Sequence, residues 1–158
     1  MTRIKRSLVV KHSSKKMYDL VNDVERYPEF VTYCSSAEVI ESNSQEMLAR
    51  LDLKKAGINI NVLTRNKLNP PLGINMLLEE GPFTLLDGRW TFNEINESAS
   101  RVSFVLDYEF KSFALHALAS NLLTNIASDL VDILHAFFKT GVNDEDNYVS
   151  FDSCSYCY

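Results

Sequence analysis

The sequence has few of the features that mark fibrous, low-complexity or membrane-spanning chains. Its 158 residues include only 5 glycines and 4 prolines, which excludes a collagen-like or low-complexity protein. No apolar run approaches the roughly 20 residues that cross a bilayer. The apolar stretch after the basic N-terminus is only Leu8-Val9-Val10, too short for the apolar core of a secretory signal. We therefore expect a cytoplasmic protein whose folded structure begins near the first residues.

Cysteine is also scarce, and its spacing excludes a disulfide framework. The chain has three cysteines, and Cys34 lies far from Cys154 and Cys157. The last two have the spacing of a redox or metal pair. A redox pair, however, sits at the start of a helix that lowers its thiol pKa, and a structural zinc site needs four ligands. We therefore expect no metal site.

The motifs of the common enzyme classes are missing as well. There is no glycine-rich phosphate loop, no G-x-S-x-G elbow and no H-E-x-x-H pair. The three histidines, His12, His116 and His135, are scattered along the chain. Asp107 and Glu109 alternate onto the polar face of a predicted strand, so we expect both to face solvent. Acid–base catalysis needs a buried or like-charge-coupled group, and we therefore predict no catalytic residue and no enzyme activity.

The charge is unevenly distributed. The net charge is −5, and residues 142–158 carry four acidic residues and no lysine or arginine, which leaves the rest nearly neutral. Arg65 and Arg89 are expected to form surface ion pairs, with contact to a ligand's polar head as the alternative. The basic patch that precedes the first acidic residue is a candidate phosphate contact, although a solvated strand face is the more common explanation. It consists of Arg3, Lys5, Arg6, Lys11, Lys15 and Lys16.

The hydrophobic pattern predicts a strand, two short helices, six strands and one long helix. Ser13 or Ser14 can cap the first helix, because a hydroxyl there accepts a hydrogen bond from a backbone N–H. The second short helix is expected between Glu25 and Phe30. Alternating apolar and polar residues indicate antiparallel strands with one face on a core. The strands are predicted at 3–11, 36–42, 46–54, 58–68, 73–80, 83–93 and 101–110.

Residues 114–139 are predicted to form one helix about 40 Å long, at about 1.5 Å per residue. Its apolar residues advance by three or four positions and trace one stripe. The stripe consists of Leu115, Leu118, Leu122, Ile126, Leu130, Ile133 and Phe137.

This order of elements predicts an α+β fold in which a curved antiparallel sheet wraps around the long C-terminal helix. Wrapping hides the apolar face of the sheet, which would otherwise meet water. An apolar hollow between sheet and helix would suit an isoprenoid or acyl chain. Small residues on the helix would leave room for one: Ala117, Ala119, Ala127 and Ala136.

Four segments together resemble a known family. They are DVERYPEF at 23–30 followed by Cys34, LTRN at 63–66, GPFTLLDGRWTF at 81–92, and the strand from Phe104 to Phe110. In this combination and order the chain is similar to the coenzyme Q-binding START-domain family. That family includes bacterial ribosome-association toxins and mitochondrial ubiquinone chaperones, and it shares a superfamily with polyketide cyclases.

The resemblance implies a START-like helix-grip domain over residues 1–141. The acidic tail, residues 142–158, lies outside it. It also implies an apolar pocket, and motif position suggests its lining residues. We expect ligand contacts from Tyr27, Pro28, Phe30, Tyr33, Phe83, Trp90, Phe92, Tyr108, Leu122 and Ile126.

The favoured function is non-enzymatic binding of a hydrophobic ligand, ubiquinone or another polyprenyl lipid, in support of respiration. No other cofactor is expected, and transient contact with a membrane would accompany such a role. The alternative is a toxin-like factor that binds the large ribosomal subunit and blocks subunit joining, with the basic patch on RNA phosphate. A polyketide cyclase or dehydrase is less favoured, because it needs a buried acid–base pair.

Overall fold

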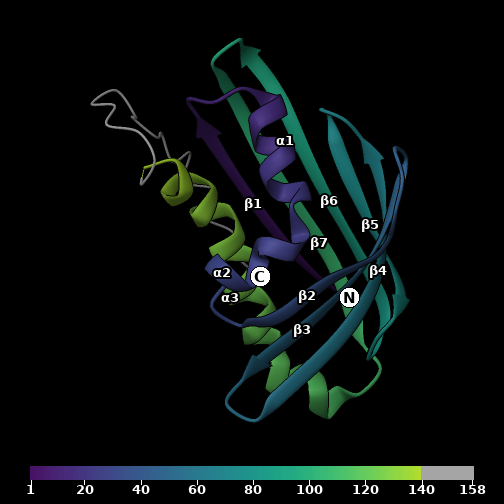
Figure 1. Cartoon of the computed structure of the whole chain (residues 1–158). Coiled ribbons are helices and arrows are strands. Elements are labelled where there is room, and N and C mark those ends of the chain that lie inside the picture. Colours follow the sequence, from purple (N-terminus) through teal and green to yellow (C-terminus); the bar gives the residue numbers. More distant parts are fainter. Residues whose placement is uncertain (140–158) are drawn as a thin grey trace.

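One antiparallel sheet of seven strands curves around one long helix (Figure 1). The computed structural model describes residues 1–139, apart from the side chains of 133 and 135–139. The order across the sheet is β1-β7-β6-β5-β4-β3-β2, so β1 and β2 are its two edges. The strands are β1 (Thr2–Val10), β2 (Cys34–Ser42), β3 (Glu46–Lys55), β4 (Ile58–Asn69), β5 (Gly73–Glu80), β6 (Phe83–Asn96) and β7 (Ala99–Phe110).

The predicted strands and α+β class are confirmed, with strand ends shifted by up to three residues. The alternation seen in β7 has the expected structural effect: Val102, Phe104 and Leu106 are buried towards the helix, and Ser103 and Val105 between them are half-buried. Every neighbouring pair of strands is antiparallel. Local sequence patterns therefore account for the sheet.

The short helices follow β1 and close one end of the sheet. Helix α1 (Ser14–Asn22) begins at Ser13, whose hydroxyl accepts a hydrogen bond from the Lys16 amide at 3.3 Å. The second predicted helix is divided into a 3-10 turn, η1 (Val24–Arg26), and one helical turn, α2 (Tyr27–Phe30). Helix α1 packs against β6 and β7, whereas η1 and α2 pack against β2.

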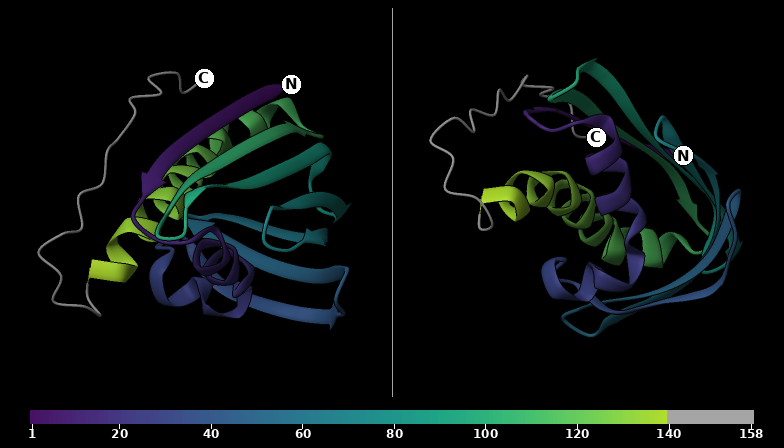
Figure 2. Two further views of the ribbon diagram at one scale, coloured as in Figure 1. Left: turned by 90° about the horizontal axis from the view of Figure 1, so that it is seen from above. Right: turned by 45° about the horizontal axis from the view of Figure 1, so that its top comes forward.

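Helix α3 (Phe113–Lys139) lies in the concave face of the sheet (Figure 2). It packs mainly against β1 and β7. The stripe predicted for it is wrong at Leu118, which is 65% exposed. Consecutive residues are about 100° apart around a helix, and the buried face is centred between Ala119 and Leu123, which leaves Leu118 outside it. The buried residues of α3 are Ala119, Leu122, Leu123, Ile126, Ala127, Val131 and Leu134.

Within the described part of the chain, no helix is both long and apolar enough to cross a membrane. The predicted apolar residues Ile133 and Phe137, and also His135 and Ala136, have side chains outside the described set.

Asp107 departs from the expectation that it faces solvent. It points to the convex face of β7, but only 6% of the residue is exposed. The guanidinium of Arg3 donates to both of its carboxylate oxygens, at 2.6 and 2.8 Å, and Arg89 donates to Oδ2 at 3.3 Å. The hydrogen bond from Arg3 is the main cause that lowers the pKa of Asp107. The prediction failed because the two arginines that cover this carboxylate come from neighbouring strands, β1 and β6.

The Asp107→Asn change should destabilise the fold at pH 7 by about 1 kcal/mol, the upper part of the range for partly exposed ion pairs. The pKa of Asp107 is lowered in the folded state, so the stabilisation from its ion pairs is complete above the pKa that it has in the unfolded chain. It is lost as the pH falls through the folded-state value, below about pH 4. Urea unfolding at pH 7 and pH 3 measures both effects. Glu109→Gln, at an exposed position of the same strand, is the control; an equal loss in both variants would contradict the prediction.

Candidate functional site

An apolar cavity lies between the sheet and α3. Its volume is about 70 Å³. Five consecutive strands of the sheet form one wall, and α3 forms the other. The lining residues are Leu51, Leu53, Val62, Thr64, Met76, Phe83, Leu86, Phe104 and Leu106 from β3 to β7, with Leu123, Ile126, Ala127 and Leu130 from α3.

The cavity follows from two sequence periods. Pairs two residues apart in a strand point to the same face, as Leu51 with Leu53 and Phe104 with Leu106 do here. Positions 123, 126, 127 and 130 have the i, i+3, i+4, i+7 spacing of one helix face. Ala127 is the small residue that sequence analysis expected to leave room, and it does line the cavity, whereas Ala117 is exposed.

Thr64 is the single polar residue in this lining. It is 3% exposed, and its hydroxyl donates to Oδ1 of Asn66 at 2.9 Å. Asn66 also belongs to the inner face of β4 and is 5% exposed. The threonine proton is therefore already engaged, and the wall that a ligand meets is almost purely hydrocarbon.

The volume limits what fits without movement. It is equivalent to about two water molecules in the liquid, at about 30 Å³ each, and lies well below the 300–1,000 Å³ typical of small-molecule pockets. A chain of more than a few carbons therefore requires the cavity to expand. Because α3 packs mainly against β1 and β7, expansion towards β3, β4 and β5 disturbs the fewest contacts of the helix.

The first group of predicted contact residues lies beside η1 and α2, away from the cavity. Tyr27 is buried, its hydroxyl donates to the carbonyl of Val21, and burial is the main cause that raises its pKa. Pro28 is exposed, and Phe30 is half-buried against the core. Tyr33 is half-buried, with Nζ of Lys55 4.8 Å from the centre of its ring. This group supports the end of the sheet, and its role in ligand binding stays a prediction.

Cys34, the residue that ends this signature segment, is buried. Burial is the main cause that raises the pKa of its thiol, to about 11. A thiol that stays protonated at neutral pH is a poor nucleophile, so the position suits packing.

The second group comes from β6 and β7 and forms aromatic contacts. Trp90 stacks on Phe104 with ring centres 4.4 Å apart and lies parallel to Phe92 at 6.1 Å. Phe83 stacks on Phe110 at 4.6 Å and also lines the cavity. The Tyr108 ring contacts Phe83 edge-on and lines a different hollow, described below.

On α3, Ile126 lines the cavity, and Leu122 is buried in the core without lining it. Of the ten predicted residues, Phe83 and Ile126 line the cavity and the other eight do not. Sequence reasoning missed most of the aliphatic lining. The signal was present as strand alternation and helix spacing, but only the pairing of distant strands shows which aliphatic residues leave a void.

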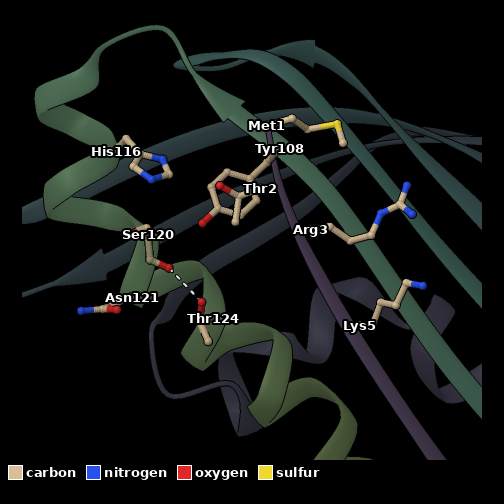
Figure 3. Close-up of a pocket in the computed structure, with 9 residues that line it drawn as sticks. All are labelled: Met1, Thr2, Arg3, Lys5, Tyr108, His116, Ser120, Asn121 and Thr124. Carbon is tan, nitrogen blue, oxygen red and sulfur yellow. Dashed lines mark hydrogen bonds between the residues drawn. The ribbon is translucent and has the colours of Figure 1, made fainter. Parts of the chain in front are cut away.

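A second hollow, here called the edge groove, has a volume of about 680 Å³ and lies between β1 and α3 (Figure 3). Its lining is mostly polar. Its residues are Met1, Thr2, Arg3, Lys5, Tyr108, His116, Ser120, Asn121 and Thr124.

Charged side chains on the convex face of the sheet are largely paired. Arg65 binds Glu46 and Glu79, and Arg89 binds Asp87 and Asp107. Both arginines therefore form the expected surface ion pairs. Among residues 1–139, no three histidine, cysteine or acidic side chains are grouped as a metal site would require.

A curved sheet that grips one helix over an apolar cavity defines a helix-grip protein of the hydrophobic-ligand-binding type. The model of the family described as polyketide cyclase / dehydrase and lipid transport matches residues 10–135, and the chain belongs to this family. A solved START superfamily protein from Mycobacterium smegmatis has the same fold. Its TM-score is 0.69 at 18% identity, over 87% of this chain and 99% of that one.

Two curated relatives carry different functional names. The ribosome association toxin RatA of Vibrio cholerae is 38% identical over 132 residues, which are 84% of this chain and 92% of the relative. The mitochondrial coenzyme Q-binding protein of Drosophila melanogaster is 27% identical over 129 residues, which are 78% of this chain and 52% of that protein. The resemblance inferred from the four sequence segments is confirmed.

Replacing Thr64 by valine should destabilise the fold by about 1–2 kcal/mol, because Oδ1 of buried Asn66 loses its donor while the side-chain volume is kept. Equilibrium urea unfolding at pH 7 measures the loss. Thr91→Val, at an exposed position of β6, should change stability by less than about 0.5 kcal/mol. Equal values for the two variants would show that the buried hydrogen bond contributes nothing.

Proposed function

We propose that this protein is a non-catalytic binding protein for an apolar chain, the hydrocarbon part of a polyprenyl quinone or of another lipid. The observation that carries the proposal is the cavity, whose thirteen lining residues include twelve apolar ones. Buried apolar surface attracts a hydrocarbon chain without requiring polar partners. The family description, which includes lipid transport, and the coenzyme Q-binding relative support the same class of ligand.

The chemistry of the wall argues for binding without reaction. No lining residue is titratable, and the buried carboxylate of Asp107 lies on the opposite face of the sheet, neutralised by Arg3 and Arg89. General acid–base catalysis needs a proton donor or acceptor within hydrogen-bond reach of the substrate. The one polar group of the lining, the Thr64 hydroxyl, already donates to Asn66, which disfavours a cyclase activity here.

A short-chain ubiquinone should raise the thermal unfolding midpoint, because a ligand that binds only the folded state stabilises it by about 2.7 kcal/mol at 100 times its Kd. Ala127→Leu fills the cavity and should abolish this shift. Ala117→Leu makes the same change at an exposed position of α3 and should retain it. Differential scanning fluorimetry with ubiquinone-2 and with dodecane distinguishes a need for the quinone head from simple uptake of hydrocarbon.

A midpoint unchanged by either compound in the parent protein would contradict the proposed function. A shift that survives Ala127→Leu would place the ligand elsewhere. Because Ala127→Leu adds volume to a packed region, its own unfolding curve must remain cooperative for the comparison to hold.

Ribosome association is the second candidate function, and the similarity to RatA favours it. The basic N-terminal patch is less available than its sequence suggests. Arg3 binds Asp107, Arg6 donates to the Ser128 hydroxyl at 2.8 and 3.1 Å, and Lys15 binds Asp19. Lys5 and Lys16 are the exposed cations of the patch for which the structure of residues 1–139 shows no acidic partner.

If this second function holds, co-sedimentation with large ribosomal subunits should weaken with salt, with a slope set by few phosphate contacts. The Lys5→Glu, Lys16→Glu double variant should bind at least about tenfold more weakly. Lys54→Glu, an exposed position on β3, is the control with the same sign of charge change. Equal binding by the double variant and the parent would exclude the N-terminal patch as the ribosome contact.

A further inference from the structure

The apolar cavity and the edge groove adjoin each other along both of their walls. On β7, Leu106 lines the cavity and Tyr108 lines the groove, and residues two apart in a strand point to the same face. On α3, Leu123 lines the cavity and Ser120 lines the groove, and residues three apart are neighbours on a helix surface. Strand and helix therefore change from apolar to polar lining at the same place, and the two hollows are consecutive compartments.

One pair of aromatic rings lies between the compartments. Phe83 lines the cavity, Tyr108 lines the groove, and the two rings meet edge-on with their centres 6.5 Å apart. Tyr108 is only 1% exposed, and burial is the main cause that raises its pKa. Its hydroxyl therefore stays protonated at neutral pH and forms a hydrogen-bond donor at the floor of the groove.

Other polar groups surround this hydroxyl (Figure 3). The side chain of Thr2 lies beside Tyr108, and the His116 ring points towards it from α3, with the ring centres 6.2 Å apart. Ser120 lines the groove one turn further along the helix. All of these side chains can donate a hydrogen bond, and none of the nine lining residues is an aspartate or glutamate. The groove therefore suits a group that carries hydrogen-bond acceptors.

The positions of the cations favour a neutral group over an anionic one. Arg3 and Lys5 extend from the other side of β1, away from His116 (Figure 3), and Arg3 is already bound to Asp107. The inner wall thus offers hydrogen bonds without a lysine or arginine, whereas a phosphate is bound best by such charged donors. Carbonyl oxygens match the inner wall better.

The two volumes assign the two ends of an amphipathic ligand. The groove, at about 680 Å³, lies within the 300–1,000 Å³ typical of small-molecule pockets, whereas the cavity holds about 70 Å³. A ring-sized head fits the groove without movement. A hydrocarbon chain gains from the apolar cavity, while in the groove it would cover polar groups without giving them hydrogen bonds.

We propose that the edge groove holds the polar head of a lipid whose hydrocarbon chain enters the cavity, and that the rings of Tyr108 and Phe83 turn aside to let the chain pass. The inference rests on the proposed lipid-binding function and narrows its ligand to a molecule with a neutral head that accepts hydrogen bonds. A quinone ring, which carries two carbonyl oxygens, has this chemistry. His116 and Ser120 donate to the head from α3, and Thr2 and Tyr108 donate from the sheet.

Thermal shifts caused by ligands test the head site. The double variant His116→Phe, Ser120→Ala keeps an aromatic ring and removes two donors. It should bind ubiquinone-2 at least about fivefold more weakly than the parent, while its response to dodecane is unchanged. Asn125→Ala removes an amide from a position of α3 that lines neither hollow, and it should bind ubiquinone-2 as the parent does. Titration of both compounds in differential scanning fluorimetry measures these differences.

The outcomes separate this inference from the proposed function. Equal binding of ubiquinone-2 by the parent and the double variant overturns the head site and leaves lipid binding intact. An equal loss of the dodecane response shows that the substitutions act through the cavity, which also overturns the head site. A parent protein that responds to neither compound contradicts both proposals.

Nuclear magnetic resonance locates the head directly. In carbon–proton spectra of the histidine rings, ubiquinone-2 should shift the His116 signals. The signals of His12, which lies beyond the other end of β1, should stay in place and serve as the internal control. Unmoved His116 signals in a protein that ubiquinone-2 stabilises would overturn the proposal.

Discussion

The burial of the concave face of the sheet against α3 is the interaction on which the rest of the structure depends. Seven strands present one apolar face, and a flat sheet of that size would leave much of it in water. Curvature lets a single helix cover it, with α1 closing the end over β6 and β7. The helix packs mainly against β1 and β7, and the cavity lies between it and the inner face of β3 to β7.

The concave and convex faces of the curved sheet also carry different kinds of side chain. The concave face holds hydrocarbon, aromatic stacks and the buried hydrogen-bonded pair of Thr64 and Asn66. The convex face carries ladders of paired charge, such as Arg3 with Asp107 and Arg65 with Glu46 and Glu79. Charge that is already paired across strands attracts an RNA backbone weakly. The apolar interior supports the proposal of an apolar ligand, and the similarity to a ribosome association toxin supports the alternative proposal of ribosome binding through the surface.

The two proposed functions would use different parts of the molecule, so substitutions can test them separately. Substitutions at lining positions such as Ala127 change the cavity, whereas substitutions at the exposed cations Lys5 and Lys16 change the surface.

The sequence by itself determined the order and class of the elements, because each strand and helix is encoded by a local period of apolar residues. It also limited the N-cap to Ser13 or Ser14, of which the structure shows Ser13, and four motifs indicated the family. Only the tertiary structure decided which residues surround the cavity, since Leu51, Met76, Phe104 and Ala127 are brought together by strand pairing and sheet curvature. It likewise decided that Asp107 is buried and that Leu118 is exposed. Both depend on what neighbouring elements cover, which no local period encodes.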